Sequence, residues 1–277
     1  MGYDVAFVLG GGGVLGATEV GMISALHEAG IRPDIVLGTS VGALNGVAVA
    51  ADPDTAADRL TRLWEDIDTT GPFGGTLAER AVTLARSRTH LHEISQLREL
   101  VEATVTARRF EDLVVPFQCV AASIQRAGPR WFDSGPLVEA VLASAAVPGI
   151  FPPVEIDGEH HYDGGLVHSI PLGRAVSLGA RTVYVLQVGR IDTPLEPPSN
   201  LLDVGLVAFE VARRHRFVEE LAQLPADVDV HVLPTGEVEG VRYDDPRTPL
   251  RYRDTSQVAA RIDAAHLASR DYLTTAG

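Results

Sequence analysis

Ser40 is the residue whose neighbours point most directly to chemistry. It stands at the centre of a G-x-S-x-G pattern, Gly38-Thr39-Ser40-Val41-Gly42. The apolar run before it, residues 35–37, predicts a short buried strand, and the run after it, residues 43–50, predicts a helix. A serine on the sharp turn between a strand and a helix has an exposed hydroxyl, and the helix N-terminus favours negative charge there. The pattern therefore predicts a nucleophile at Ser40.

Four consecutive glycines, Gly10 to Gly13, lie between another predicted strand and helix. Such a loop exposes several backbone N–H groups in one concavity, which suits an anion or a developing oxyanion. The alternatives are a plain turn and a dinucleotide site, since Gly11-x-Gly13-x-x-Gly16 fits G-x-G-x-x-G. A dinucleotide site also needs an acidic residue at the end of the next strand, whereas Asp34 precedes that strand. A P-loop is excluded because the loop lacks the lysine and the Ser/Thr after it.

A third candidate is the carboxylate of Asp163-Gly164-Gly165, which follows a β-type segment. By itself this triplet most often forms only a turn, but a serine nucleophile needs a base, and Asp163 is available for that role. His160, His161 and His168 flank it and are alternative bases, because histidine is the more basic group. His160, His161 and Asp163 also resemble a set of metal ligands. Adjacent residues on a strand point to opposite faces, which argues against a metal site.

The composition is that of a soluble, acidic, globular protein. The chain has 277 residues, of which 45% are apolar and 22% charged, and all 23 basic residues are arginine. Its net charge of −14 argues against binding nucleic acid and against electrostatic capture by an anionic membrane. The single cysteine, Cys119, excludes an internal disulfide, and its apolar neighbours predict a buried core residue.

The N-terminal region carries no pattern typical of export. A predicted strand begins at Val5, and Asp4 stands where a secretory signal has basic residues. The longest uncharged stretch, residues 35–51, is too short to span a bilayer. These features predict a cytoplasmic location.

Strands and helices are predicted to alternate along the whole chain, which indicates an α/β fold in a single domain, residues 1–277. Residues 52–112 are polar and helical, and we expect them to form an insertion in which His90 and His92 are solvated. Residues 200–277 are expected to add a helix-strand-helix extension. The predicted strands are 5–9, 35–37, 114–122, 130–132, 182–188 and 228–233, and the other predicted helices are 14–29, 136–145, 201–224 and 256–273.

Four segments in this order resemble the patatin-like phospholipase family. They are Gly11-Gly12-Gly13-x-x-Gly16, the serine motif 38–42, the proline-rich stretch 143–153 (ASAAVPGIFPP) and Asp163-Gly164-Gly165. The proline-rich stretch is the most informative of the four, because nothing in a generic hydrolase demands it. The resemblance spans residues 5–187 and is lowest in the insertion.

The resemblance implies a three-layer α/β/α fold with a mostly parallel central sheet. It also implies a Ser–Asp dyad in place of a triad, with Ser40 as the nucleophile and Asp163 as the base. The backbone N–H groups of Gly11, Gly12 and Gly13 would form the oxyanion hole. The family hydrolyses acyl esters of glycerolipids without a metal or another cofactor.

One position, Leu15, departs from the family pattern, because the glycine motif usually carries arginine or lysine there. The missing cation weakens a phospholipid assignment more than an esterase assignment. Together with the acidic net charge, it predicts a preference for neutral esters or lysolipids over anionic phospholipids. The alternative is that Leu15 only packs the first helix against the sheet.

The sequence thus predicts a serine acyl-ester hydrolase for a lipid or fatty-acyl ester, with transient membrane contact at most. Ordinary helix packing explains the large apolar side chains of the insertion better than an acyl pocket does, although both remain open. These side chains are Leu60, Leu63, Trp64, Leu77, Leu84 and Leu97. An acyltransferase, a thioesterase, a nucleotide-binding module and an inactive lipid-binding relative are the alternative functions. Acyl chain, headgroup and oligomeric state are left open.

Overall fold

Eight strands form one sheet in the computed structural model, which describes residues 2–66, 82–83, 85–188, 194–198, 201–236 and 258–276. The strand order is β5-β6-β3-β2-β1-β7-β8, and β4 pairs with β3. The strands are β1 (Val5–Leu9), β2 (Ile35–Gly38), β3 (Phe117–Ser123), β4 (Gly128–Phe132), β5 (Val154–Ile156), β6 (Glu159–Asp163), β7 (Thr182–Leu186) and β8 (Asp229–Val232).

The middle of the sheet is parallel, from β3 through β2, β1 and β7 to β8, whereas β4, β5 and β6 are antiparallel to their neighbours. All residues of β2 and β3, and all but the first of β1, are buried. Their apolar sequences reflect this, because a parallel sheet covered on both faces buries both sets of side chains.

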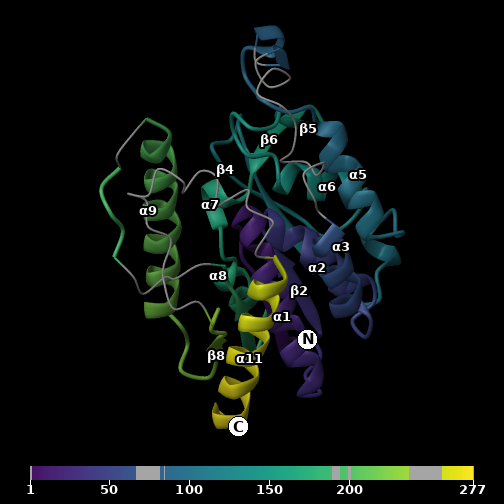
Figure 1. Ribbon diagram of the computed structural model, residues 1–277, viewed down its shortest axis with the longest axis vertical. Helices are drawn as coiled ribbons and strands as arrows, with labels where there is room; N and C mark the ends of the chain where they lie inside the picture. The colour runs from purple at the N-terminus through teal and green to yellow at the C-terminus, as the bar shows by residue number, and fades with distance from the viewer. Residues whose placement is uncertain are drawn as a thin grey trace.

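Helices cover both faces of the sheet, which confirms the three-layer α/β/α arrangement (Figure 1). One face packs against α1, α2, α3, α5, α6 and α11, and the other packs against α8 and α9. The helices are α1 (Ala17–Glu28), α2 (Val41–Ala51), α3 (Ala56–Asp66), α5 (Ile94–Thr104), α6 (Leu137–Ser144), α7 (Gly165–His168), α8 (Leu172–Ser177), α9 (Leu201–Ala222) and α11 (Val258–Ala276).

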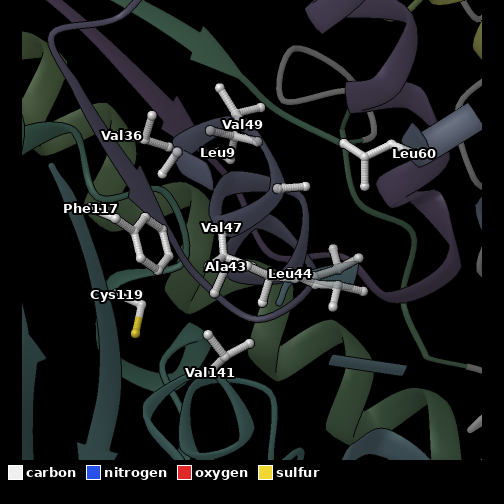
Figure 2. Packing of buried hydrophobic residues seen from close by; sticks show 14 of the residues in the cluster. Leu9, Val36, Ala43, Leu44, Val47, Val49, Leu60, Phe117, Cys119 and Val141 are labelled. Carbon is white, nitrogen blue, oxygen red and sulfur yellow. The ribbon is translucent and has the colours of Figure 1, made fainter. Parts of the chain in front are cut away.

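Helix α2 lies inside the larger of the two hydrophobic cores. Figure 2 shows its residues Ala43, Leu44 and Val47 close to side chains of the sheet and to Val141 of α6. Cys119 of β3 is completely buried in this core, as predicted. Burial raises the pKa of its thiol far above the usual value, so Cys119 is an inert core residue.

Several element boundaries differ from the sequence-based expectation. The glycine loop continues through a 3₁₀ turn, η1 (Gly13–Gly16), so α1 begins at Ala17 rather than at residue 14. β5, α7 and α8 were not predicted, because segments of three to six residues are too short for a periodic pattern. The insertion contains α3, α5 and the 3₁₀ turn η2 (Phe110–Asp112), and residues 67–81 lie outside the described ranges.

Candidate active site

The G-x-S-x-G segment forms the sharp turn that its sequence predicts. β2 ends at Gly38 and α2 begins at Val41, so Ser40 occupies the position immediately before the helix. Its backbone has φ 57° and ψ −123°, a conformation that non-glycine residues rarely adopt. Strained residues of this kind gather at functional sites, where the surrounding structure holds them. The conformation of Ser40 is therefore consistent with a functional role.

Both glycines of this turn are required by close backbone contacts. A Cβ atom on Gly38 would lie 2.4 Å from the carbonyl oxygen of Gly42. A Cβ atom on Gly42 would lie 2.4 Å from the carbonyl oxygen of Leu9, at the end of β1. One backbone neighbour belongs to α2 and the other to β1, so both are held by regular structure, and the two glycines let α2 start directly above the strands.

Strand pairing brings Asp163 to Ser40. β4 occupies one edge of β3, so β2 and β6 share the other edge. Along that edge Gly38 is opposite Cys119 and Asp163 is opposite Ala121. The ends of β2 and β6 therefore meet over β3. There, Ser40 Oγ donates a hydrogen bond of 2.6 Å to Asp163 Oδ2.

The carboxyl group of Asp163 is almost completely buried, with 2% of the residue exposed. Its second oxygen, Oδ1, accepts a hydrogen bond of 2.7 Å from the N–H of Gly165. Burial raises the pKa of Asp163 to about 6, outweighing the hydrogen bonds from Ser40 and Gly165, which lower it. Within the described part of the chain no arginine or histidine forms an ion pair with it. Asp163 is consequently a stronger base than a carboxylate in water.

The proline-rich stretch positions both members of this pair. Ser144 Oγ, at the end of α6, accepts the N–H of Ser40 at 3.0 Å, and the Ser144 carbonyl oxygen accepts the N–H of Gly164 at 3.1 Å. The carbonyl oxygen of Ala146 accepts the N–H of Asp163 at 2.9 Å. Ser144 was not among the site residues predicted from the sequence, and the specificity of the stretch that contains it is the signal that could have identified it.

The four amides of the glycine loop differ in availability. The N–H of Gly10 donates to the carbonyl oxygen of Leu186, and the N–H of Gly11 donates to that of Ser169, both at 2.9 Å. The expectation that Gly11 donates to an oxyanion therefore needs correction, because its hydrogen is already donated. The N–H groups of Gly12 and Gly13 form no hydrogen bond to another described residue, and both residues are only partly buried. These two amides remain candidate donors.

His168, one of the alternative bases, has its ring turned toward other elements. Its Nδ1 lies 3.3 Å from Glu220 Oε1 of α9, and its ring lies 5.3 Å from the ring of Trp131. The main chain of His168 does support the serine turn, since its carbonyl oxygen accepts the Thr39 hydroxyl at 2.7 Å. Its ring thus serves contacts with α9 and β4.

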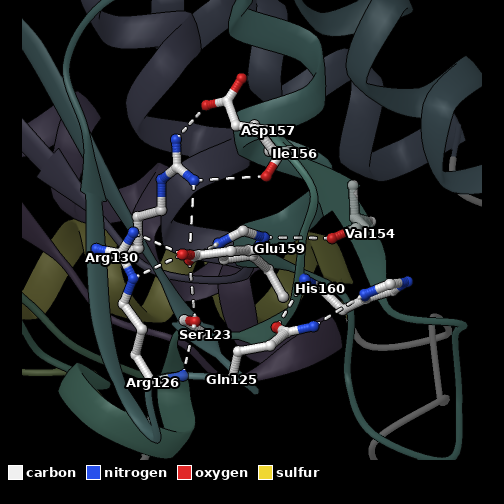
Figure 3. Close-up of polar contacts among 10 residues, drawn as sticks. Ser123, Gln125, Arg126, Arg130, Val154, Ile156, Asp157, Glu159 and His160 are labelled. Atoms are coloured by element: carbon white, nitrogen blue, oxygen red, sulfur yellow. Dashed lines mark hydrogen bonds and ion pairs between the residues drawn. The ribbon is translucent and has the colours of Figure 1, made fainter.

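The other two histidines belong to a polar network at the sheet edge, shown in Figure 3. His160 Nδ1 lies 3.1 Å from Gln125 Nε2, and buried His161 directs Nδ1 at a backbone carbonyl oxygen 3.3 Å away. Glu159, which precedes them on the strand, forms an ion pair with Arg126 at 2.5 Å. The network anchors β6, the strand that ends at Asp163.

The sequence argued against a metal site at His160, His161 and Asp163, and it predicted that His90 and His92 are solvated. In the ranges that the structure describes, no group of three or more His, Cys, Asp and Glu side chains is placed to hold a metal ion. The expectation that His92 is solvated was wrong: it is 6% exposed and packs beside Phe151, with 6.1 Å between ring centres.

The candidate acyl-pocket residues of the insertion belong to the core. Leu60, Trp64 and Leu97 are buried in the larger hydrophobic cluster, and Leu63 packs against it. The helix-packing interpretation therefore holds for these four residues. Leu77 and Leu84 lie outside the described residues. Leu15 is also buried, with 6% exposed, which favours a packing role at that position.

A family model described as "Patatin-like phospholipase" matches residues 7–176, more than half of the chain. The matched region contains the glycine loop, Ser40 and Asp163. The chain belongs to the patatin-like phospholipase family. This membership confirms the resemblance seen in the sequence motifs.

Two relatives of this patatin-like protein are much longer than the chain. It is 33% identical over 201 residues to "Lysophospholipase nte1" of Aspergillus terreus, and this aligned segment covers 69% of this chain and 12% of that protein. It is 33% identical over 209 residues to "Patatin-like phospholipase domain-containing protein ZK370.4" of Caenorhabditis elegans, and this aligned segment covers 74% of this chain and 14% of that protein.

Solved structures give weaker matches. VipD from Legionella pneumophila superposes with a TM-score of 0.47 at 15% identity, covering 99% of this chain and 67% of that one. The type III effector ExoU gives a TM-score of 0.37 at 13% identity, covering 98% of this chain and 53% of that one. In the described part of the patatin-like chain, no helix combines the length and hydropathy needed to cross a membrane.

Proposed function

We propose that this patatin-like protein is a serine acyl-ester hydrolase that cleaves lipid acyl esters, with Ser40 as the nucleophile and Asp163 as its base. The observation that carries the proposal is the 2.6 Å hydrogen bond from Ser40 Oγ to a buried carboxylate oxygen of Asp163. This is the contact that a general base needs in order to take the serine proton.

The proposed reaction begins when ionised Asp163 takes the hydroxyl proton of Ser40 as Oγ attacks the ester carbonyl carbon. The carbonyl π electrons move to oxygen and give a tetrahedral intermediate. When the intermediate collapses, the bond to the alcohol oxygen breaks, and that oxygen receives the proton from Asp163. A water molecule, deprotonated by Asp163, then attacks the acyl-enzyme, and collapse releases the fatty acid and restores the Ser40 hydroxyl.

The negative charge on the carbonyl oxygen needs donors beside Ser40. The N–H groups of Gly12 and Gly13 are proposed for this role, because they form no hydrogen bond within the described chain. Gly11 instead holds the loop through its bond to Ser169. Two backbone donors in fixed positions resemble the oxyanion holes of other acyl hydrolases.

Lysophospholipids are the proposed substrate class, with contact to the membrane only transient. Relatives named lysophospholipases support this choice, although the chain spans a small part of their length. The net charge of −14 disfavours binding to an anionic lipid surface and favours substrates presented singly or in neutral assemblies.

The test is covalent labelling with a fluorophosphonate, followed by peptide mapping and by an assay on a lysophospholipid. We expect the label on Ser40 and no labelling of Ser40→Ala, with hydrolysis reduced to background. Asp163→Asn should lose ~10²–10⁴-fold in rate, while His160→Ala and His168→Ala stay close to wild type. An active Ser40→Ala variant would refute the proposal.

A further inference from the structure

Glu19, in the first turn of α1, is an acidic residue that the proposed reaction does not use. It is completely buried, with 0% exposed. Asn45 Nδ2 donates to its Oε2 at 2.8 Å, whereas Oε1 has no hydrogen-bond partner among the described residues. Asn45 links this buried acid to Gly16, at the end of the candidate oxyanion loop.

Asn45 connects Glu19 to the remaining parts of the site. It lies in α2, the helix that begins next to Ser40, and is itself completely buried. Its Nδ2 donates to the carbonyl oxygen of Gly16 at 2.9 Å as well as to Glu19. Its Oδ1 accepts the indole N–H of Trp64, in α3, at 2.9 Å. The side-chain amide of Asn45 thus donates two hydrogen bonds and accepts one, each with a buried partner.

The network therefore joins the two halves of the proposed machinery. Gly16 ends the 3₁₀ turn that follows Gly12 and Gly13, whose amides form no hydrogen bond to another described residue. Asn45 is rigidly attached to α2, whose first turn follows the nucleophile. Oxyanion donors must lie about 2.7–3.1 Å from the position of the oxyanion, so the separation of loop and helix has to be held closely.

We propose that Glu19 is a positioning residue which, through Asn45 and the hydrogen bond of Asn45 to Gly16, holds the glycine loop at the correct distance from the helix that follows the nucleophile. This inference rests on the proposed function, because it assumes that the loop amides stabilise an oxyanion. It assigns no contact between Glu19 and the substrate.

The position also requires Glu19 to be uncharged. A carboxylate buried directly behind the loop would repel the developing oxyanion and cancel part of the stabilisation by the amides. The groups in contact with the network from α2 and α3 are the neutral side chains of Asn45 and Trp64. On α11, His266 pairs with Glu28 at the opposite end of α1. Burial raises the pKa of Glu19 well above its usual value, which supports the neutral form.

The experiment compares Glu19→Gln with Glu19→Ala, using Met22→Ala as the matched control. Glutamine keeps the shape, the acceptor oxygen and the neutral charge, whereas alanine leaves Asn45 without its partner. Met22 is equally buried in α1 but has no polar contact with the loop, so its truncation reports only on packing. The readouts are kcat and KM on a lysophospholipid, affinity for a trifluoromethyl ketone that forms an oxyanion, and thermal unfolding.

We expect Glu19→Ala to lose ~10–100-fold in kcat with KM within threefold, and to lose ketone affinity by the same factor. Glu19→Gln should stay within threefold of wild type in both. Met22→Ala should lose thermal stability without a comparable loss of kcat. Trp64→Phe, which removes the indole N–H together with part of the ring, should show a smaller kcat loss and serves if Glu19→Ala does not fold.

Four results would overturn the inference. One is a kcat for Glu19→Ala, or for Trp64→Phe in its place, no lower than that of Met22→Ala. Another is a Glu19→Gln variant as impaired as Glu19→Ala, which would mean that the charge itself is needed. The third is wild-type protein that a fluorophosphonate does not label, which refutes the proposed function as well. The fourth is labelling of the wild type together with unchanged labelling of Glu19→Ala, which refutes only the positioning role.

Discussion

At the scale of single residues, the protonation of Asp163 sets the pH range of the proposed dyad. Burial raises the pKa of this carboxyl to about 6, and only its ionised form can accept the Ser40 proton. We expect kcat/KM to be constant above pH 7 and to fall about tenfold per pH unit well below pH 6. A pH–rate profile on a neutral monoacyl ester measures this, and a profile flat down to pH 4 contradicts the assignment.

The same raised pKa predicts how Asp163 affects stability. The folded protein disfavours the ionised form of Asp163. The contribution of this group to the free energy of unfolding is therefore fully present below its ordinary pKa of 3.8 and is lost as the pH rises through its folded-state pKa of about 6. Asp163→Asn should therefore raise the unfolding free energy at pH 8, by up to about 3 kcal/mol, and leave it nearly unchanged at pH 3.5. Urea unfolding at both pH values tests the sign, and equal effects at the two would contradict it.

Ser144 is expected to matter more than an ordinary buried hydroxyl. Ser144→Ala leaves the N–H of Ser40, in its strained turn, without an acceptor, which costs about 1–3 kcal/mol. The rate of ester hydrolysis should fall about tenfold because the nucleophile loses its fixed position. The control is Ser177→Ala, whose exposed hydroxyl bonds only within α8. Equal melting temperatures and rates for the two variants would show that Ser144 does not position the turn.

At the scale of elements, the 3₁₀ turn before α1 explains the unusual Leu15. Its side chain is buried, so arginine there would place a charge in the core and cost about 3 kcal/mol or more. We expect Leu15→Arg to melt at lower temperature and to lose activity on an anionic phospholipid and a neutral monoacylglycerol together. Ile124→Arg, at a position 46% exposed, is the matched control. A selective gain on the anionic substrate would restore the charge argument drawn from the sequence.

At the scale of the whole molecule, α11 supports the element that carries the glycine loop. It packs along α1, where Ile262 and Ala265 contribute to the larger core, and Figure 1 shows the two helices side by side. α11 lies beyond the region matched by the family model, yet its removal would uncover α1.

Ile262→Asp tests this dependence. A buried, unpaired carboxylate between α1 and α11 should cost several kcal/mol and reduce both stability and activity. Leu267→Asp, on the same helix but 49% exposed, should leave both unchanged. Thermal unfolding of the two variants is the measurement, and similar melting temperatures would mean that α11 is dispensable.

The local parts of the fold and of the candidate site followed from the sequence. The presence of a sharp turn at Ser40 could be predicted from residues 35–50, because two glycines, a β-rich run and a helical run leave little freedom to the backbone. The α/β class follows from the alternation of apolar strands and helices, and the buried state of Cys119 follows from its neighbours.

Long-range partners were decided by the tertiary structure. Ser40 and Asp163 are 123 residues apart. They meet because β2 and β6 both pair with β3 and lie end to end along it, a register that no local pattern encodes. The same holds for the Gly11 amide, which is consumed by Ser169, and for Glu19, whose partner lies on another helix. Hydrogen bonds between distant segments depend on how the layers stack, and the sequence around each residue carries no trace of its partner.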